Sequence, residues 1–585
     1  MLTKNKIHFI HSAINQYEVN YGNRFIPLWA YTLASYIPKN WEVTIYDVEL
    51  VGVEKVEEAT VFAFSGINQD CEAINNNYKI LKQKYPLAKF VIGGPIVWSY
   101  QQANRLQELD HFDYIIVMDG EEALPWLLNQ INSKTPNVKK IMQFKRFNLN
   151  LANTINFDLL KNANKNYYGG IVEVSRGCPF LCEFCDIRVL PDNNRSHHKA
   201  IETIIKELDA YCQAGIFQFQ LACDNFIGDP NWAKKCVEAI LDWQTQTKHK
   251  IGIWTWLTVD IVKHPELMRK MRRAGFSMLF IGVESFNASS IIETAKVQNK
   301  NDQNQMVESI KKIQAFGFVV VPGLIFGFDN DDQEMFDDMN QGMVDTGLIG
   351  GDPSFLVAMP GTPLYKRMSE SSRIIDESLS PSAPSTFRTY KLSSNIQFLQ
   401  DNGYLKKGYL SFAKNVISPD LAFKKFKRHL EIMQNSTDFV AVNSASYVNP
   451  VHGVLLHLTS FEMVKRLVKR LLIILNPKRF WVVLKAFVLF LKISKKRPGL
   501  FSHYVFWLFN WTNLIDKYQD ITNDDLRLES VDQNYDYNKL WKSLEEQVAL
   551  KSNGRDENNI KVADQLKYTA KGLVRLKEKL LKTNG

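Results

Sequence analysis

Short apolar runs alternate with longer helical stretches in two successive series along this 585-residue chain, and this alternation constrains the fold more than any other feature. The first series has apolar runs at 6–13, 42–49, 61–67, 89–95 and 113–120. Continuous apolar runs are typical of strands buried on both faces, and the segments between them are long enough for crossover helices. We therefore expect a doubly wound parallel sheet of Rossmann-like type in a domain at residues 1–150.

The second series lies between about residues 171 and 370 and contains six strand–helix units. Its apolar runs are 171–175, 217–224, 251–260, 276–285, 318–328 and 353–359. Repeated units of this kind form a parallel barrel or partial barrel, whose active site lies at the carboxyl ends of the strands. The predicted fold class is therefore α/β, with a partial (β/α)6 TIM-like barrel at residues 151–370 after the first domain.

Three of the seven cysteines, Cys178, Cys182 and Cys185, form a C-x3-C-x2-C group directly after the first strand of the second series. Such a group is explained by a zinc site, by an iron–sulfur cluster or by coincidence. Zinc needs a fourth ligand, for which His197 and His198 are candidates, although adjacent histidines in a polar loop are commonly just solvated. A cubane cluster on three thiolates leaves one iron open to a small molecule.

The remaining cysteines and the amino terminus bear on the location of the protein. An odd number of cysteines in a long chain does not indicate a disulfide framework. The apolar run Ile7 to Ile10 is also too short for the core of a signal peptide. We therefore expect a cytoplasmic protein.

The spacing of the triad, with Phe184 directly before the last cysteine, resembles the signature of the radical S-adenosylmethionine superfamily. The resemblance implies a 4Fe-4S cluster on the three cysteines, with S-adenosylmethionine chelated by the open iron. It also implies a flavodoxin- or ferredoxin-type electron donor, because one electron cleaves the cofactor to a 5'-deoxyadenosyl radical.

Looser motifs of the same family follow the triad in the family's order. Two polar residues end the second strand, near the amino group of the cofactor by resemblance, and two more end the fourth strand, near its ribose. A G-x-I-x-G stretch matches the one that packs against adenine. The cofactor-binding residues implied are Phe184, Asp224, Asn225, Glu284, Ser285, Gly323, Ile325 and Gly327. Cys223 departs from the family, which usually has an aspartate there.

In one branch of this family, which includes hopanoid methylases, a cobalamin-binding domain similar to residues 1–150 precedes the barrel. The predicted strands of that domain end in polar or glycine-rich residues, which on spacing alone favour turns. The resemblance implies that these residues line cobalamin: Ser65, Gly93, Gly94, Gly120 and Glu121. No Asp-x-His-x-x-Gly motif occurs in the sequence, so no histidine is evidently placed to coordinate cobalt.

The positions of the other cysteines exclude several classes of reaction. Only Cys71 precedes the triad, too few for the second cluster of methylthiotransferases, and no cysteine follows Cys236. Auxiliary clusters after the barrel and a late methyl-carrying thiol are thereby excluded. The resemblance implies cobalamin-dependent C-methylation of an unactivated carbon, and we expect a lipid or isoprenoid substrate. The alternatives are a cobalamin-associated radical oxidation, cyclisation or rearrangement, and a non-catalytic corrinoid or iron–sulfur sensor.

Beyond the barrel the sequence divides into three parts: an extension at 371–445, a basic amphipathic region at 446–520 and a polar helical tail at 521–585. Residues 461–500 contain eleven Lys or Arg and one acid, so they account for the whole net charge of +9. Basic residues beside Trp, Phe and Leu are typical of a helix lying in a membrane surface. The alternative is a helical cap whose apolar face packs on the barrel. A spanning helix and nucleic-acid binding are disfavoured, because the apolar runs are interrupted and do not alternate with basic residues.

Overall fold

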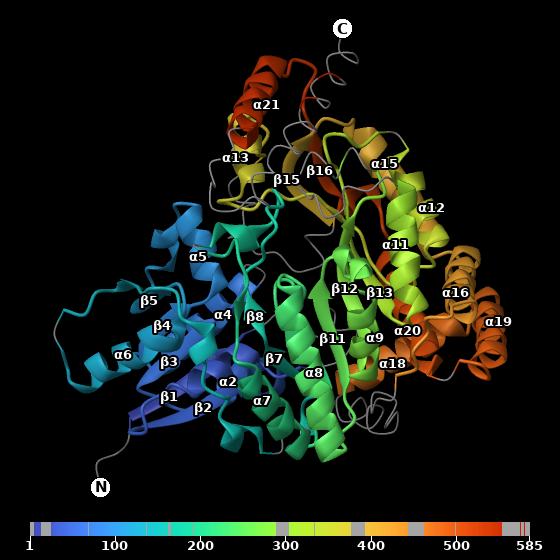
Figure 1. Cartoon of the computed structure of the whole chain (residues 1–585). Helices are drawn as coiled ribbons and strands as arrows, with labels where there is room; N and C mark the ends of the chain where they lie inside the picture. Colours follow the sequence, from blue (N-terminus) through green and yellow to red (C-terminus); the bar gives the residue numbers. More distant parts are fainter. Residues whose placement is uncertain are drawn as a thin grey trace.

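The computed structural model of the chain contains two six-stranded parallel sheets, one after the other in the sequence, and a largely helical carboxyl-terminal region (Figure 1). The structure describes residues 5–12, 25–67, 70–135, 137–161, 165–190, 192–287, 290, 303–332, 334–375, 392–442, 461–497, 499–552, 574 and 578.

The amino-terminal sheet has the strand order β2-β1-β3-β4-β5-β6. Its strands are β1 (Asn5–His11), β2 (Trp41–Asp47), β3 (Val61–Ser65), β4 (Lys89–Gly93), β5 (Tyr114–Val117) and β6 (Ile141–Gln143). Its main helices are α2 (Leu28–Ala34), α4 (Cys71–Lys84), α5 (Pro95–Gln102) and α6 (Gly120–Asn132).

Successive side chains of this sheet point to opposite faces, and helices cover both faces. Phe62 and Phe64 pack in the core formed with α4 and α5, whereas Val61 and Ala63 pack in the core formed with α2 and α6. This arrangement explains why the strands read as continuous apolar runs. The predicted doubly wound sheet is confirmed, and its strand order reverses between β1 and β3, where such sheets bind ligands.

The second sheet has the strand order β14-β13-β12-β11-β10-β7, so consecutive strands lie next to one another. Its strands are β7 (Gly170–Glu173), β10 (Gln218–Ala222), β11 (Gly252–Leu257), β12 (Phe276–Glu284), β13 (Val319–Phe326) and β14 (Ser354–Phe355). Its helices are α7 (Ile201–Gln213), α8 (Pro230–Thr247), α9 (Pro265–Arg273), α11 (Gln303–Ala315) and α12 (Met335–Asp345). The sheet has edges at β7 and β14, which confirms the predicted partial barrel.

The carboxyl-terminal region is mostly helical, as predicted. Its helices are α13 (Pro363–Glu370), α15 (Asn402–Val416), α16 (Pro419–Gln434), α18 (Phe461–Ile474), α19 (Pro477–Ser494), α20 (Phe501–Tyr518) and α21 (Tyr537–Ser552). It also contains a two-stranded parallel sheet, β15 (Ser393–Phe398) with β16 (Arg527–Ser530). β16 is only four residues long and Leu528 is its one apolar residue, so this pairing was not among our predictions.

Helix α20 fixes the tail to the barrel. The Trp507 indole donates a hydrogen bond to the Ala422 carbonyl oxygen at 3.1 Å. His429 Nε2 on α16 lies 2.9 Å from His503 Nδ1 on α20. On its other side, His429 Nδ1 lies 2.6 Å from Gln314 Oε1 of α11. Within the described residues, no helix is both long enough and apolar enough to cross a membrane.

Candidate functional site

The three cysteines lie on a loop at the carboxyl edge of the barrel sheet, which we call the cysteine loop (residues 177–185). It follows β7 and the short strand β8 (Ser175–Arg176). Gly177 has a φ of +88°, and a Cβ atom there would lie 2.1 Å from the Arg195 carbonyl oxygen, so glycine is required. The Cys178 amide then donates to the Asn193 carbonyl oxygen at 2.9 Å. Backbone contacts thus fix the start of the loop.

Burial and nearby charges shift the pKa values of two thiols in the cysteine loop, Cys178 and Cys185. Burial raises the pKa of the Cys178 thiol to about 12, and the nearby charges of Cys182 and Asp224 raise it further. Burial also raises the pKa of Cys185, assisted by Asp186 and by the other two cysteines. Among the described residues, no three His, Cys, Asp or Glu side chains already converge closely enough to hold a metal ion. Because thiolates are the metal-binding form, loading a cluster would release protons here.

The two candidate fourth ligands have other contacts. His197 and His198 form the strand β9 (His197–His198), which pairs antiparallel with β8. The His197 ring lies 2.6 Å from the Asp192 carbonyl oxygen, and the His198 ring stacks on Trp232 with centroids 4.4 Å apart.

The polar residues after β10 lie against the cysteine loop. The Asp224 carboxylate accepts a hydrogen bond from the Gly177 amide at 2.5 Å, and the Asn225 amide donates to the Cys178 sulfur at 3.9 Å. Burial raises the pKa of Asp224 to about 6. Cys223 is buried, and its sulfur lies 3.3 Å from a threonine hydroxyl of β11. Asp224 and Asn225 therefore position the first cysteine.

The end of β12 has an irregular backbone. Its pairing with β13 shifts register between Gly282 and Glu284, and Glu284 has a φ of +67°, which is rare for any residue with a side chain. The Glu284 carboxylate lies beside Gly323 of β13, and the Ser285 hydroxyl accepts a hydrogen bond from the Asn287 amide at 3.0 Å. Such local strain is concentrated at functional sites.

The G-x-I-x-G stretch on β13 contains two glycines with different surroundings. A Cβ atom on Gly323 would make only ordinary contacts, the nearest with the Phe280 ring at 3.4 Å. Gly327 has a φ of +94°, and a Cβ atom there would lie 2.3 Å from the ring of Phe398 on β15. Ile325 is half-buried against the barrel core. Gly327 is therefore required by its backbone conformation and its packing, whereas the surroundings of Gly323 would tolerate a Cβ atom.

Phe184 and its neighbour Glu183 connect the cysteine loop to the far side of the barrel mouth. The Phe184 ring lies 6.4 Å from the ring of Phe328, just after β13. The Glu183 carboxylate accepts a hydrogen bond from Arg367 Nε of α13 at 2.9 Å, and the Glu183 carbonyl oxygen accepts one from the Leu364 amide at 3.2 Å. The loop is thus held by a helix that follows the sixth strand.

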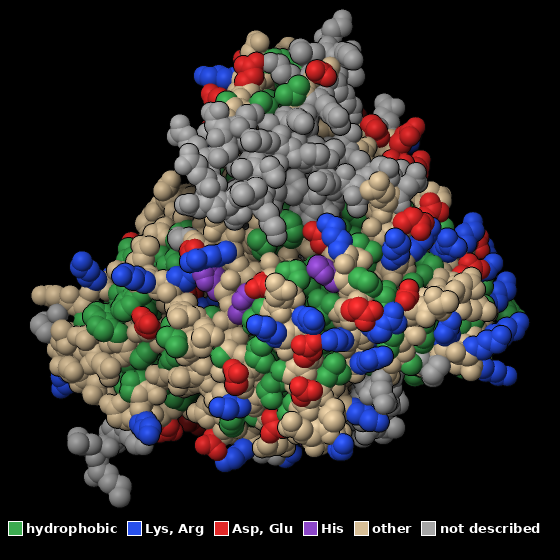
Figure 2. Space-filling view, viewed as in Figure 1, with side chains coloured by type: hydrophobic (Ala, Val, Ile, Leu, Met, Phe, Trp, Pro, Cys, Tyr) green, Lys and Arg blue, Asp and Glu red, His purple; other side chains and the backbone are tan. Residues whose placement is uncertain are grey.

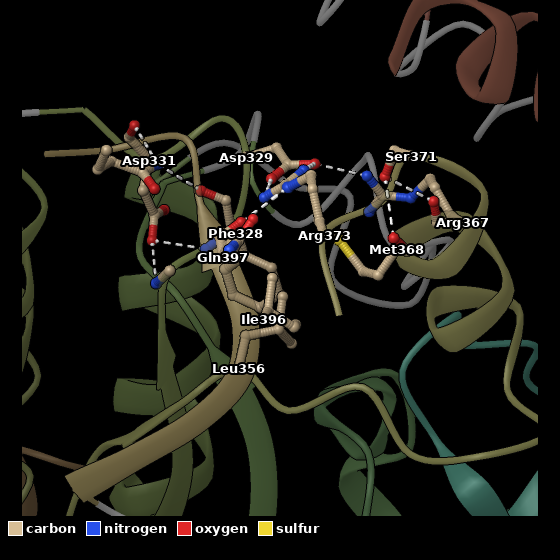
Figure 3. A network of polar contacts seen from close by, with 12 residues as sticks. Phe328, Asp329, Asp331, Leu356, Arg367, Met368, Ser371, Arg373, Ile396 and Gln397 are labelled. Atoms are coloured by element: carbon tan, nitrogen blue, oxygen red, sulfur yellow. Dashed lines mark hydrogen bonds and ion pairs between the residues drawn. The ribbon is translucent and has the colours of Figure 1, made fainter. Parts of the chain in front are cut away.

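Arg367 also belongs to a buried network of charged side chains (Figure 3). Its Nη1 donates to Asp329 Oδ2 at 2.5 Å, and Arg373 contacts both oxygens of Asp329, at 2.7 and 3.0 Å. Burial alone would raise the pKa of Asp329, but Arg373 and Arg367 hold it below its usual value. With Glu183 the network contains two carboxylates and two guanidinium groups, so its charges balance.

The carboxyl-terminal tail covers this network. The Tyr535 hydroxyl donates to the Ser371 carbonyl oxygen at 2.7 Å, and the Ser543 hydroxyl donates to the Arg367 carbonyl oxygen at 3.3 Å. Our sequence analysis did not identify Glu183, Arg367 or their partners as site residues. A glutamate inside a metal-binding motif was the one available signal, but its partner lies far away in the sequence.

The residues expected to line cobalamin fall into two groups. Ser65 and Gly93 are paired neighbours at the carboxyl ends of β3 and β4. Gly94 follows with a φ of +85°, and a Cβ atom there would lie 2.2 Å from the Ser65 hydroxyl. Gly120 and Glu121 begin α6, after the next strand. All five lie on the carboxyl edge of the amino-terminal sheet.

Arg176 joins this edge to the cysteine loop. Its guanidinium contacts Glu121 at 2.5 Å and Asp119 at 3.1 Å in the amino-terminal domain, and Glu173 of β7 at 2.7 Å. Glu121 is thus buried in an ion pair with Arg176 that links the two domains. Because Arg176 stands two residues before Cys178, the carboxyl edges of both sheets meet beside the cysteines.

Residues 172–341 match the protein family described as the Radical SAM superfamily. This part of the chain is a radical S-adenosylmethionine domain. The matched residues contain the cysteine loop, the strands β10 to β13 and every barrel residue that the sequence motifs identified.

Two relatives and one solved structure extend this match beyond the barrel. An uncharacterized methyltransferase of Synechocystis is 27% identical over 66% of this chain and 73% of its own length. The hopanoid C-2 methylase of Rhodopseudomonas palustris is 25% identical over 67% of this chain and 71% of its own length. The structure of the cobalamin-dependent radical enzyme OxsB, with aqua-cobalamin and S-adenosylmethionine bound, has a TM-score of 0.54 at 15% identity. The match covers 93% of this chain and 84% of OxsB. The chain therefore shares the fold of OxsB.

The donor set at the barrel mouth fits the iron–sulfur cluster of this superfamily. Cys182 lies close enough to raise the pKa values of Cys178 and Cys185, and the three cysteines of this loop would supply three thiolate ligands.

Proposed function

We propose that this protein is a cobalamin-dependent radical S-adenosylmethionine methylase that acts on an unactivated carbon of a lipid or isoprenoid. The meeting of the two carboxyl edges at Arg176 is the observation that carries the proposal. One edge belongs to a doubly wound sheet, which binds ligands there, and the other belongs to a barrel, whose active site lies there. A methyl donor and a radical source bound at these edges would face each other.

Each group in the proposed site has its own residues. Cys178, Cys182 and Cys185 would hold the cluster, and the edge that contains Ser65 and Gly93 would hold cobalamin. When bound, the cluster and S-adenosylmethionine supply a hydrogen-abstracting radical, and cobalamin supplies the methyl group. The described residues of the protein orient these parts.

Three contacts perform this orientation. Asp224 fixes the start of the cysteine loop through the Gly177 amide, and Glu183 fixes its end through Arg367. Arg176 sets the amino-terminal domain against the loop. All three contacts involve side chains that are at least partly buried, where ionic hydrogen bonds are strongest.

Two observations support methylation and a lipid substrate. Both sequence relatives reported above are named as methyltransferases or methylases, and one of them acts on a hopanoid. The carboxyl-terminal helices also expose a large apolar surface. A substrate that partitions into membranes would be encountered at such a surface.

The experiment uses anaerobically reconstituted full-length protein with cobalamin, a flavodoxin or ferredoxin reducing system, and a lipid extract. S-adenosylmethionine carries an isotopic label in its methyl group. We expect 5'-deoxyadenosine and one labelled methyl group in a lipid product, both of which require the cysteines, so Cys182→Ala should give neither. Formation of 5'-deoxyadenosine with an altered but unlabelled lipid would replace methylation by radical oxidation, cyclisation or rearrangement. Cofactor binding without cleavage under every reductant and lipid fraction would favour the sensor.

A further inference from the structure

Helix α19 has two apolar faces, and only one of them packs against the protein. The buried face contacts α16 and α20 and consists of Val482, Ala486, Phe490 and Ile493. The second face repeats at the same three- and four-residue spacing and consists of Trp481, Leu484, Val488 and Leu491. Trp481 is 59% exposed. Water-facing sides of helices are normally polar, so this second face calls for a covering partner.

Helix α18 extends the same exposed surface. Leu472, in its last turn, and Leu475, directly after it, are 64% and 66% exposed, and Val468 and Leu471 are also exposed. Ten of the nineteen exposed large apolar side chains in the described part of the chain lie between residues 468 and 501. Apolar surface concentrated in this way marks an interaction site, whereas scattered exposed residues are ordinary.

Lysines border these apolar side chains. Lys469 pairs with Asp516, but within the residues that the structure describes no carboxylate pairs with the exposed lysines Lys478, Lys485, Lys492, Lys495 and Lys496. Basic side chains gather along the edge of the molecule where α16 and α19 lie (Figure 2). The charge of residues 461–500 is +10, with Glu462 as the single acid.

We propose that this α18–α19 surface docks on membranes that contain anionic lipids. The four apolar residues of α19 and those of α18 would enter the boundary between headgroups and acyl chains, and the unpaired lysines would contact lipid phosphates. The charge decides the partner, because a surface with this excess of lysine is complementary to a dense sheet of negative headgroups. The inference does not depend on the proposed reaction, since it rests on these helices alone.

Full-length protein is sedimented with vesicles of phosphatidylcholine and with vesicles that also contain phosphatidylglycerol. We expect binding to the anionic vesicles that weakens as salt is added. The double variant K485E/K492E should bind at least about 25-fold more weakly, because each lysine near an anionic surface contributes about fivefold to the affinity. K234E/K235E, on the exposed side of α8, changes the charge equally and should bind like the wild type.

The apolar part of the surface is tested by W481S/L484S/V488S, which should lower the affinity more than tenfold. The matched control, L87S/L151S, removes two leucines that are 93% and 68% exposed elsewhere, and it should have no effect. Circular dichroism and gel filtration of the free proteins verify folding and size. The proposal fails if the wild type ignores anionic vesicles, or if either surface variant binds like the wild type. It also fails if the surface variants merely convert a wild-type dimer to monomers, because a second copy would then be the partner.

Discussion

Glu183 and Arg367 form a fully buried ion pair, with 2.9 Å between the carboxylate and Nε, although 184 positions separate them in the sequence. Glu183 stands between the second and third cysteines, and Arg367 lies on the helix after the last barrel strand. The position of the cysteine loop therefore depends on the far end of the barrel domain.

Arg367→Met should destabilise the protein by about 3–5 kcal/mol, because it leaves Glu183 and Asp329 buried without their common partner. Urea unfolding of the unloaded protein measures this loss. Lys311→Met, which breaks the surface pair with Glu308, is the control and should cost at most about 1 kcal/mol. An equal cost for both variants would mean that the buried network does not stabilise the fold.

Replacing any of Cys178, Cys182 and Cys185 with alanine should abolish binding of the iron–sulfur cluster, because a cubane would retain only two protein ligands. Iron content and the visible absorbance of the reconstituted protein measure the effect. Cys212→Ala and Cys236→Ala, in buried positions on α7 and α8, are matched controls and should keep the cluster. Retention of full iron content in a triad variant would contradict the assignment.

His429 and His503 should make the protein less stable in mild acid. Burial lowers the pKa of His429 from 6.5 to about 3, and burial, with smaller contributions from a protonated His429 and from Arg272, holds that of His503 well below 6.5. Both are therefore neutral in the folded protein, while the unfolded chain takes up protons below pH 6.5. Their stabilisation is complete above pH 6.5 and is lost as the pH falls toward about 3. Each histidine contributes up to about 1.4 kcal/mol per pH unit in that window.

Urea unfolding at several pH values between 7.5 and 5 measures this dependence. The double variant H429Q/H503Q keeps polar side chains at both positions but removes the titrating groups. Its free energy of unfolding should fall less steeply with decreasing pH than that of the wild type. Parallel curves for the two proteins would assign the acid sensitivity to other groups.

Gly327→Ala should destabilise the protein by about 1–3 kcal/mol or more, because a φ of +94° is strained for alanine and its Cβ would overlap Phe398. Gly403→Ala, near the start of α15, meets only the Asp401 carboxylate at 3.2 Å and should have little effect. Adding Phe398→Leu to Gly327→Ala should recover the part of the loss that comes from overlap. Equal thermal unfolding of the Gly327→Ala variant and the wild type would contradict the packing role of Gly327.

Local patterns in the sequence predicted both sheets correctly. The apolar runs that contain Phe62 and Val319 are strands buried on both faces, and this burial produces their continuous apolar character. The pairing of β15 with β16 was not predictable in this way, because residues 527–530 contain one apolar side chain, Leu528, and form a strand only beside their tertiary partner.

The residues of the candidate site also fall into those that local motifs predicted and those that only the fold brings together. Cys178, Asp224 and Glu284 were found because each follows a recognisable strand and belongs to a motif. Arg367, Asp329 and Arg373 are ordinary charged residues in the sequence, and only the fold brings them together. Glu121 was singled out for cobalamin, which stays a prediction; the ion pair that it forms with Arg176 was not foreseen.

The hydrogen bond from Ser543 to the Arg367 carbonyl oxygen has a consequence for the nascent chain. The barrel strands leave the ribosome early, but the cover over the charge network is completed only after residue 543 has been synthesised. Until residue 543 has been translated, we expect the ion pair between Arg367 and Asp329 to remain partly hydrated. Iron delivered to the cysteines during that interval would meet a loop whose anchor is not yet enclosed, so cluster insertion is expected to follow the completion of the polypeptide.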